Sequence, residues 1–177
     1  MGRVSPVKNY DLLIKAVEEI RLNEPDLRDK IFVQVIGGPG LMSQQSYYNK
    51  LIEQVREKNL NSVINFIGPL PQNEVLPYYQ NCNLFINLSE TGSIDKAVLE
   101  AMACEKLVLT SNEAFKNILP AKLFLTEKNP DDLAKKIKEL YNLSEGEKEG
   151  LQKKLRQEVE EHHNLEKLTK SIVKLYE

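Results

Sequence analysis

The chain has 177 residues, 41% of them hydrophobic and 28% charged, which suffices for one globular domain with a substantial core. Its formal net charge of −2 gives no general signal for nucleic acid, and no apolar run is long enough to cross a bilayer. Cys82 and Cys104 lack metal-ligand spacing and are typical of reduced thiols, so we expect a cytoplasmic protein whose peripheral membrane association stays open.

Helix-period stripes alternate with short apolar runs along the whole chain. In order, the pattern predicts a helix near 13–20 with Asn9 as its N-cap, a strand at 31–36, a helix at 48–55, a strand at 63–67, a short helix at 74–81, a strand at 84–88, a helix at 97–102, strands at 107–110 and 123–125, a helix at 133–140, and a charged helical tail over 151–177. The strands are mostly apolar on both faces, as in a covered parallel sheet. We therefore expect one α/β domain over 1–177 that binds its ligand beyond the carboxyl ends of its strands.

The segment 92–96 is the first candidate site. Gly92 and Ser93 precede a predicted helix, whose free backbone N–H groups and dipole favour an anion. Lys96 would add a full charge there, although a solvated surface lysine is the simpler alternative. Glu100, one turn later, could grip ribose hydroxyls or could simply pair with Lys96 on the surface.

The N-terminal loop is the second candidate. Arg3 and Lys8 lie five residues apart before a helix, and together they could clamp a diphosphate, Arg3 by bidentate contacts and Lys8 as a point charge. Basic residues in a loop are more often solvated. The glycine-rich segment 37–40 lacks the dinucleotide-binding spacing, so a plain turn is the better interpretation.

Four segments, in this order and spacing, carry a family resemblance. They are G-R-V-S-P-V-K-N-Y-D-L-L-I-K-A at 2–16, V-I-G-G-P-G at 35–40, I-N-F-I-G-P-L-P-Q-N-E-V-L-P-Y-Y-Q-N-C-N-L-F-I-N-L-S at 64–89, and L-E-A-M-A-C at 99–104. Together they resemble the donor-binding, C-terminal half of the retaining family-4 glycosyltransferases of GT-B architecture. The resemblance implies a Rossmann-like, three-layer α/β/α domain that binds a UDP- or GDP-linked sugar, and transfer of the sugar to a glycan or lipid-linked acceptor.

The resemblance also implies roles for individual residues. Arg3 and Lys8 match the basic pair that stabilises the departing diphosphate, and Glu100 matches the second acid of the E-x7-E signature, which binds the donor ribose. The loop facing the donor sugar and phosphate corresponds to Gly92, Ser93, Ile94, Asp95 and Lys96, and the loop beside the base to Gly68, Pro69 and Leu70. Such enzymes need no metal or other cofactor, because protein cations and amide dipoles neutralise the leaving group.

Three departures from the family pattern affect these expectations. Gly92 stands where the first acid belongs and Glu90 is two residues out of register, which leaves backbone amides or Asp95 as substitutes. Glu105 and Leu107 replace the usual Gly and Pro after the helix, which removes a favourable C-cap.

The third departure is the strand expected before Arg3, which would lie in the middle of the sheet. We expect a neighbouring chain to replace it in a strand-exchanged oligomer, or the sheet to close up. The acceptor-binding N-terminal domain is also absent from the sequence, so we expect no sugar transfer by this chain alone. The alternative is a non-catalytic nucleotide-binding or interaction module with the same fold.

Overall fold

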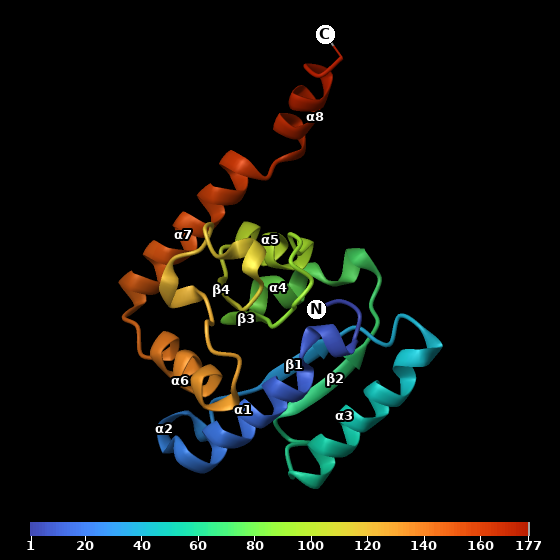
Figure 1. Cartoon of the computed structure of the whole chain (residues 1–177). Helices are drawn as coiled ribbons and strands as arrows, with labels where there is room; N and C mark the ends of the chain where they lie inside the picture. Colours follow the sequence, from blue (N-terminus) through green and yellow to red (C-terminus); the bar gives the residue numbers. More distant parts are fainter. Residues whose placement is uncertain (177) are drawn as a thin grey trace.

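A computed structural model describes residues 1–176 of the chain. The helices are α1 (Tyr10–Asn23), α2 (Pro25–Arg28), α3 (Gln45–Glu57), α4 (Leu76–Asn81), α5 (Lys96–Ala103), α6 (Pro130–Tyr141), α7 (Glu145–His162) and α8 (Leu165–Val173). The strands are β1 (Val33–Ile36), β2 (Ile64–Gly68), β3 (Leu84–Asn87) and β4 (Leu107–Thr110). Helices and parallel strands alternate as predicted, and the fold is a Rossmann-like α/β domain (Figure 1).

The strands form two separate parallel pairs. β1 pairs with β2 and β3 pairs with β4, and within residues 1–176 no strand joins the two pairs (Figure 1). The expectation that the sheet closes up is therefore wrong, because β1 and β3 remain apart. The predicted strand at 123–125 is reduced to a single bridge between Phe124 and Thr110 beside the hydrogen bond from Leu125 N to Thr110 O (2.8 Å).

Helices flank the strands in two groups, each buried through its apolar stripe. α1 packs against α2, α3 and α6, while α5 packs against α4, α7 and both strands of the second pair. The α1 stripe predicted from the sequence is buried, including Ala16, Val17 and Ile20 at 0% exposure. One continuous apolar core runs from Val4 to Leu155 and holds the two strand pairs in the same domain.

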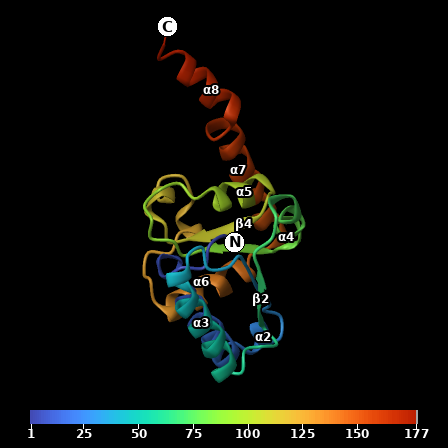
Figure 2. The ribbon, with the colours of Figure 1, turned by 90° about the vertical axis from the view of Figure 1, so that its right-hand side faces the viewer.

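The C-terminal tail differs from the expected single helical segment. α7 begins at Glu145, where Ser144 and Glu147 form a reciprocal capping box, and ends at His162. α8 follows after Asn164, which caps it, and none of its residues is buried. Figure 2 shows α8 projecting away from the strands and from the other helices. Its apolar residues Leu165, Leu168 and Ile172 are exposed.

The end of α5 keeps the cap that the sequence appeared to lose. Glu105 adopts the left-handed conformation, with φ of 55°, that glycine usually takes after a helix. Lys106 N donates to Ala101 O (3.1 Å) and Glu105 N to Met102 O (3.0 Å), which is the Schellman pattern. The glutamate therefore carries a backbone cost that a glycine would avoid.

Candidate functional site

The N-terminal segment crosses the carboxyl ends of both strand pairs. Gly2 N donates to Ile36 O at the end of β1 (2.9 Å), and Val4 N donates to Gly38 O just beyond it (2.8 Å). At the other end of the segment, Glu90 N beyond β3 donates to Val7 O (3.0 Å). The loop that carries both candidate cations thus lies at the edge where an open α/β sheet binds ligands.

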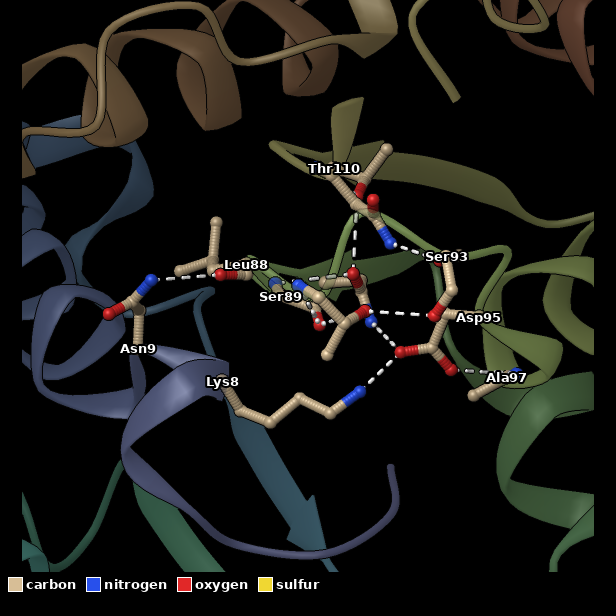
Figure 3. Close-up of polar contacts among 11 residues, drawn as sticks. Lys8, Asn9, Leu88, Ser89, Ser93, Asp95, Ala97 and Thr110 are labelled. Carbon is tan, nitrogen blue, oxygen red and sulfur yellow. Dashed lines mark hydrogen bonds and ion pairs between the residues drawn. The ribbon is translucent and has the colours of Figure 1, made fainter. Parts of the chain in front are cut away.

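Lys8 and Asp95 meet at the start of α5. Lys8 Nζ donates to Asp95 Oδ2 as an ion pair, and both side chains are largely buried, with 18% and 14% exposure (Figure 3). Asp95 is also the N-cap of α5, because Oδ1 accepts from Ala97 N (3.3 Å). The carboxylate at the positive end of this helix therefore belongs to Asp95, and its cation is Lys8 rather than Lys96.

The environment of Asp95 favours its charged form. Burial by itself raises the pKa of this carboxyl, but the hydrogen bonds from Lys8 and Asn87 and the charge of Lys8 outweigh it, so the pKa lies below its ordinary value. Asp95 is consequently ionised at neutral pH. Lys8 is held in place by a fixed negative charge before any ligand arrives.

Two asparagines that the sequence analysis missed hold the loop before α5. Asn87, at the end of β3, donates to Asp95 Oδ2 (2.9 Å) and accepts from Thr110 Oγ1 (3.2 Å). Asn112, beyond β4, donates to Ser93 O (2.9 Å). Both side chains are at most 5% exposed. The available signals were the polar end of an otherwise apolar strand for Asn87 and the polar segment that directly follows such a strand for Asn112.

Asn9 does not cap α1 with its side chain. Its backbone is left-handed, with φ of 49°, and its side-chain amide donates to Leu88 O at the end of β3 (3.0 Å; Figure 3). The prediction that Asn9 is the N-cap residue of α1 is right in position, but the expected side-chain bond is replaced by a tertiary one. Asn9 thereby fixes the position of Lys8 relative to β3.

Arg3 lies on the opposite side of the loop from Lys8, beside the end of β1. The hydrogen bonds and ion pairs within residues 1–176 do not include its guanidinium, and the residue is exposed. Its aliphatic stem rests on Gly40, where an added Cβ would come within 2.4 Å of Arg3 Cδ. Gly40 therefore provides the space in which Arg3 lies.

The predicted base-side loop lies beside this glycine-rich turn. Gly37 N donates to Gly68 O (2.8 Å), and an added Cβ on Gly38 would touch Pro69 Cδ at 3.4 Å. Leu70 follows Pro69 and is half-buried. The structure thus brings the loops after β1 and β2 together with Arg3, while Lys8 and Asp95 form a separate cluster beyond β3.

The remaining predicted residues are solvent-facing. Gly92 has φ of 67°, Ile94 is 40% exposed, and Lys96 is exposed with no ion pair to Glu100 among those formed within residues 1–176. Glu100 instead accepts a hydrogen bond from Tyr79 OH (2.7 Å), a partner that the sequence analysis missed. Its carboxylate keeps further acceptor capacity.

Glu90, the out-of-register acid, faces Lys128 at 3.4 Å on the surface. No three His, Cys, Asp or Glu side chains of residues 1–176 gather as a metal-binding group, and metal independence of the function stays a prediction. None of the helices within the same range combines the length and apolar character of a membrane span. The arrangement as a whole offers two cations and exposed loop backbone at the strand ends, which suits a phosphate-bearing ligand.

Comparison with known proteins identifies the family. The model of the family described as "Glycosyl transferases group 1" matches residues 1–162. The chain belongs to this family. A curated relative, the D-inositol 3-phosphate glycosyltransferase of Kribbella flavida, is 32% identical over 107 residues, which cover 59% of this chain and 24% of that protein. The matched part thus spans about a quarter of the relative's length.

Solved glycosyltransferase structures share the fold. The chain is similar to Anabaena HepE, crystallised with UDP and glucose, with a TM-score of 0.80, 18% identity and coverage of 99% of this chain and 47% of HepE. It is also similar to the C-terminal domain of the group 1 protein LpcC from Francisella tularensis, with a TM-score of 0.79, 20% identity and coverage of 93% and 84%. These likenesses identify the fold as the C-terminal half of GT-B glycosyltransferases.

Proposed function

We propose that this chain is the donor-binding domain of a retaining, family-4 type glycosyltransferase that takes its sugar from a nucleoside diphosphate sugar. The observation that carries the proposal is the placement of Arg3 and Lys8 on one loop across the strand ends, with Lys8 held at the start of α5 by Asp95. HepE, which shares the fold, was crystallised with UDP and glucose, so UDP is the first nucleotide to test.

The proposed chemistry follows from where charge develops. As the bond between the sugar and the diphosphate breaks, negative charge grows on the phosphate oxygens. Lys8 supplies a full positive charge beside these oxygens. Arg3 approaches from the β1 side, and its guanidinium has no hydrogen-bond or ion-pair partner within residues 1–176. Backbone N–H groups of the loop 92–95 add dipoles, and Glu100 accepts hydrogen bonds from the ribose hydroxyls while Tyr79 fixes its carboxylate.

Asp95 holds the Lys8 ammonium in place before a ligand binds, and it also competes with the ligand for that cation. Lys8 is oriented without a ligand, which lowers the entropy cost of binding a diphosphate. The same carboxylate repels the incoming phosphates, so we expect Lys8 to share its three N–H donors between Asp95 and the ligand. The loss of the first acid of E-x7-E at Gly92 removes one contact to the donor sugar, and loop amides take that place in this proposal.

The acceptor site lies outside this chain in the proposal. A curated relative is about four times as long as the segment that it shares with this chain, which leaves ample length there for an acceptor site. We therefore expect donor binding without turnover from the isolated chain. A non-catalytic nucleotide-binding module is the second candidate, favoured by Gly92 in place of an acid; it predicts nucleotide affinity that does not depend on the sugar.

Calorimetric titration of the 177-residue chain with UDP, GDP and ADP and with their glucose conjugates tests the proposal. We expect one nucleotide class to bind, and Lys8→Ala to weaken its affinity at least about tenfold, or about 1.4 kcal/mol. Glu100→Gln should weaken binding of the nucleoside diphosphate but not of inorganic pyrophosphate. Lys58→Ala is the matched control, because Lys58 also forms a part-buried ion pair, with Glu18 (2.6 Å), on another surface.

Two results would decide against the proposal. Binding that Lys8→Ala and Glu100→Gln leave unchanged would place the nucleotide elsewhere on the domain. Equal affinity for UDP and its sugar conjugate, together with no transfer after addition of an acceptor-binding partner, would favour the non-catalytic module.

A further inference from the structure

The loop before α5 is held from beneath by one connected set of hydrogen bonds. Asn112 Nδ2 donates to Ser93 O (2.9 Å), and Asn112 N donates to Thr110 Oγ1 (3.1 Å). Thr110 Oγ1 in turn donates to Asn87 Oδ1 (3.2 Å), and Asn87 Nδ2 donates to Asp95 Oδ2 (2.9 Å). The set therefore holds the loop at two points that lie two residues apart, Ser93 and Asp95, which Figure 3 shows with their dashed contacts.

The side chains that make these bonds are buried and oriented. Asn112 and Thr110 are 0% exposed and Asn87 is 5% exposed, so the loss of any one bond would leave a buried polar group unpaired. The amide of Asn112 has only one suitable orientation. Its Oδ1 accepts from Ala114 N (3.1 Å), which leaves Nδ2 to face the carbonyl of Ser93.

This support determines the direction of one peptide group. A trans peptide places its C=O and its N–H on opposite sides of the chain, so the Ser93 carbonyl that faces buried Asn112 directs the N–H of Ile94 away from the core. Ser93 and Ile94 are both exposed, and no hydrogen bond formed among residues 1–176 uses the Ile94 N–H. An oriented and free backbone donor thus lies directly before the residue that pairs with Lys8.

We propose that Asn112 is a positioning residue for the donor site: by holding the Ser93 carbonyl, it directs the Ile94 N–H at a phosphate oxygen of the bound nucleotide. This inference rests on the proposed function, because it assigns Ile94 to the same ligand as Lys8. Lys8 supplies charge and the Ile94 N–H supplies a dipole that is oriented before negative charge develops on the phosphate. Asn112 does not touch the ligand, since it is 0% exposed.

A purely structural role for Asn112 is the simpler alternative. In that case its side chain only stabilises the loop and the 3-10 turn Glu113–Phe115 that it caps, and the folded protein binds its ligand equally well without it. A substitution that keeps the cap but loses the bond to Ser93 separates the two roles. Serine does so, because its hydroxyl is a good acceptor for Ala114 N, whereas its side chain is too short to reach Ser93 O as well.

The test compares the 177-residue chain with its Asn112→Ser variant by calorimetric titration with UDP and with inorganic pyrophosphate. We expect the affinity for both probes to fall about tenfold or more, because a hydrogen bond to a charged group is lost. Asn164→Ser is the matched control. Asn164 also caps a helix, accepting from Lys167 N (2.8 Å), but α8 projects away from the strands, so both affinities should stay at the wild-type value (Figure 2).

Amide signals in ¹H–¹⁵N correlation spectra report on the peptide group itself. In the wild type, saturating UDP should move the Ile94 N–H signal downfield and slow its hydrogen exchange at least about tenfold. Asn112→Ser should lose both responses. The signal of Ala97 N–H, which donates to Asp95 Oδ1 (3.3 Å), should stay in place in the ligand-free variant, which shows that α5 still begins correctly.

Three outcomes would overturn the inference. UDP that binds with the expected dependence on Lys8 but leaves the Ile94 signal unmoved would refute it and leave the donor-binding proposal intact; this wild-type result decides even if Asn112→Ser does not fold. An Ile94 signal that responds equally in Asn112→Ser would show that the peptide keeps its direction without Asn112. Failure of both probes to bind the wild type would also refute it, and the proposed function would fail with it only if GDP and ADP did not bind either.

Discussion

Lys8 and Asp95 lie 87 residues apart in the sequence and form a largely buried ion pair that connects the N-terminal loop to the start of α5. The pair joins the segment beside β1 to the segment beside β3. It is both a structural contact and, in the proposed function, the point at which the diphosphate competes for a cation.

The stability contributed by this pair should depend on pH. The folded-state pKa of Asp95 is depressed, so its contribution is present above the unfolded value of about 3.9 and is lost as pH falls through the lower folded value. Asp95→Asn keeps an acceptor for the cap but removes the charge, and we expect it to cost about 1–2 kcal/mol at pH 7.

Urea unfolding of the wild type and Asp95→Asn from pH 7 to pH 3 measures this effect. The difference in free energy of unfolding should shrink below about pH 4, because Asp95 is then protonated in the unfolded wild-type chain at a pH where the folded protein still keeps it ionised. Asp29→Asn, at an exposed residue after α2, is the control. A difference that stays constant over the whole range would contradict the pair's electrostatic origin.

The position of Arg3 should be sensitive to Gly40. In Gly40→Ala the new Cβ would meet the flexible stem of Arg3 at 2.4 Å, so the guanidinium must move while the backbone stays in place. We expect UDP affinity to fall about as far as in Arg3→Ala, with the free energy of unfolding changed by less than about 0.5 kcal/mol. Calorimetry and thermal unfolding check both parts.

The double variant Arg3→Ala/Gly40→Ala tests whether both changes lower UDP affinity through the Arg3 side chain. If both changes act through one side chain, the losses should not add. Gly146→Ala serves as the control, because nothing lies within 4 Å of a Cβ at that position in α7. Additive losses would mean that Gly40 acts on the ligand by another route.

Asn9 combines a left-handed backbone with a tertiary hydrogen bond, and the two contributions can be separated. Asn9→Ala should cost about 2 kcal/mol, because it loses the bond to Leu88 O and places alanine at positive φ. Asn59→Ala is matched, since Asn59 is also left-handed, with φ of 54°, but exposed. Chemical denaturation of the two variants should show the larger loss at Asn9; equal losses would mean that the bond contributes nothing.

Glu105→Gly should stabilise the protein. Glycine adopts the left-handed C′ conformation without the clash that a Cβ causes, so we expect a gain of about 1 kcal/mol and a rise in Tm of about 2–4 °C. Differential scanning fluorimetry of Glu105→Gly beside Glu105→Ala measures it. A comparable gain from alanine would trace the effect to the lost charge, not to the backbone.

The sequence predicted the strand–helix alternation well because apolar stripes determine which faces are buried, as along α1 and β4. The sequence did not predict the features that depend on contacts between residues distant in the chain. Nothing local indicates that Asn9 reaches Leu88, that Tyr79 supports Glu100, or that Asn112 holds Ser93. The predicted strand at 123–125 forms only one bridge, between Phe124 and Thr110. Residues 121–123 form a 3-10 turn, and one backbone hydrogen bond, from Leu125 N to Thr110 O, follows it. The capping role of Asp95 was readable from its position before a helix, yet its partner Lys8 was not.

Ligand binding at the N-terminal segment should raise the free energy of unfolding of the whole domain by thermodynamic linkage. The nine residues of this segment are anchored to the end of β1 through Gly2 and to the end of β3 through Asn9, and they carry both candidate cations between these anchors. A ligand that binds Arg3 and Lys8 together therefore links the half of the fold that contains β1 and β2 to the half that contains β3 and β4. At a hundredfold excess over its dissociation constant it would add about 2.7 kcal/mol to the free energy of unfolding.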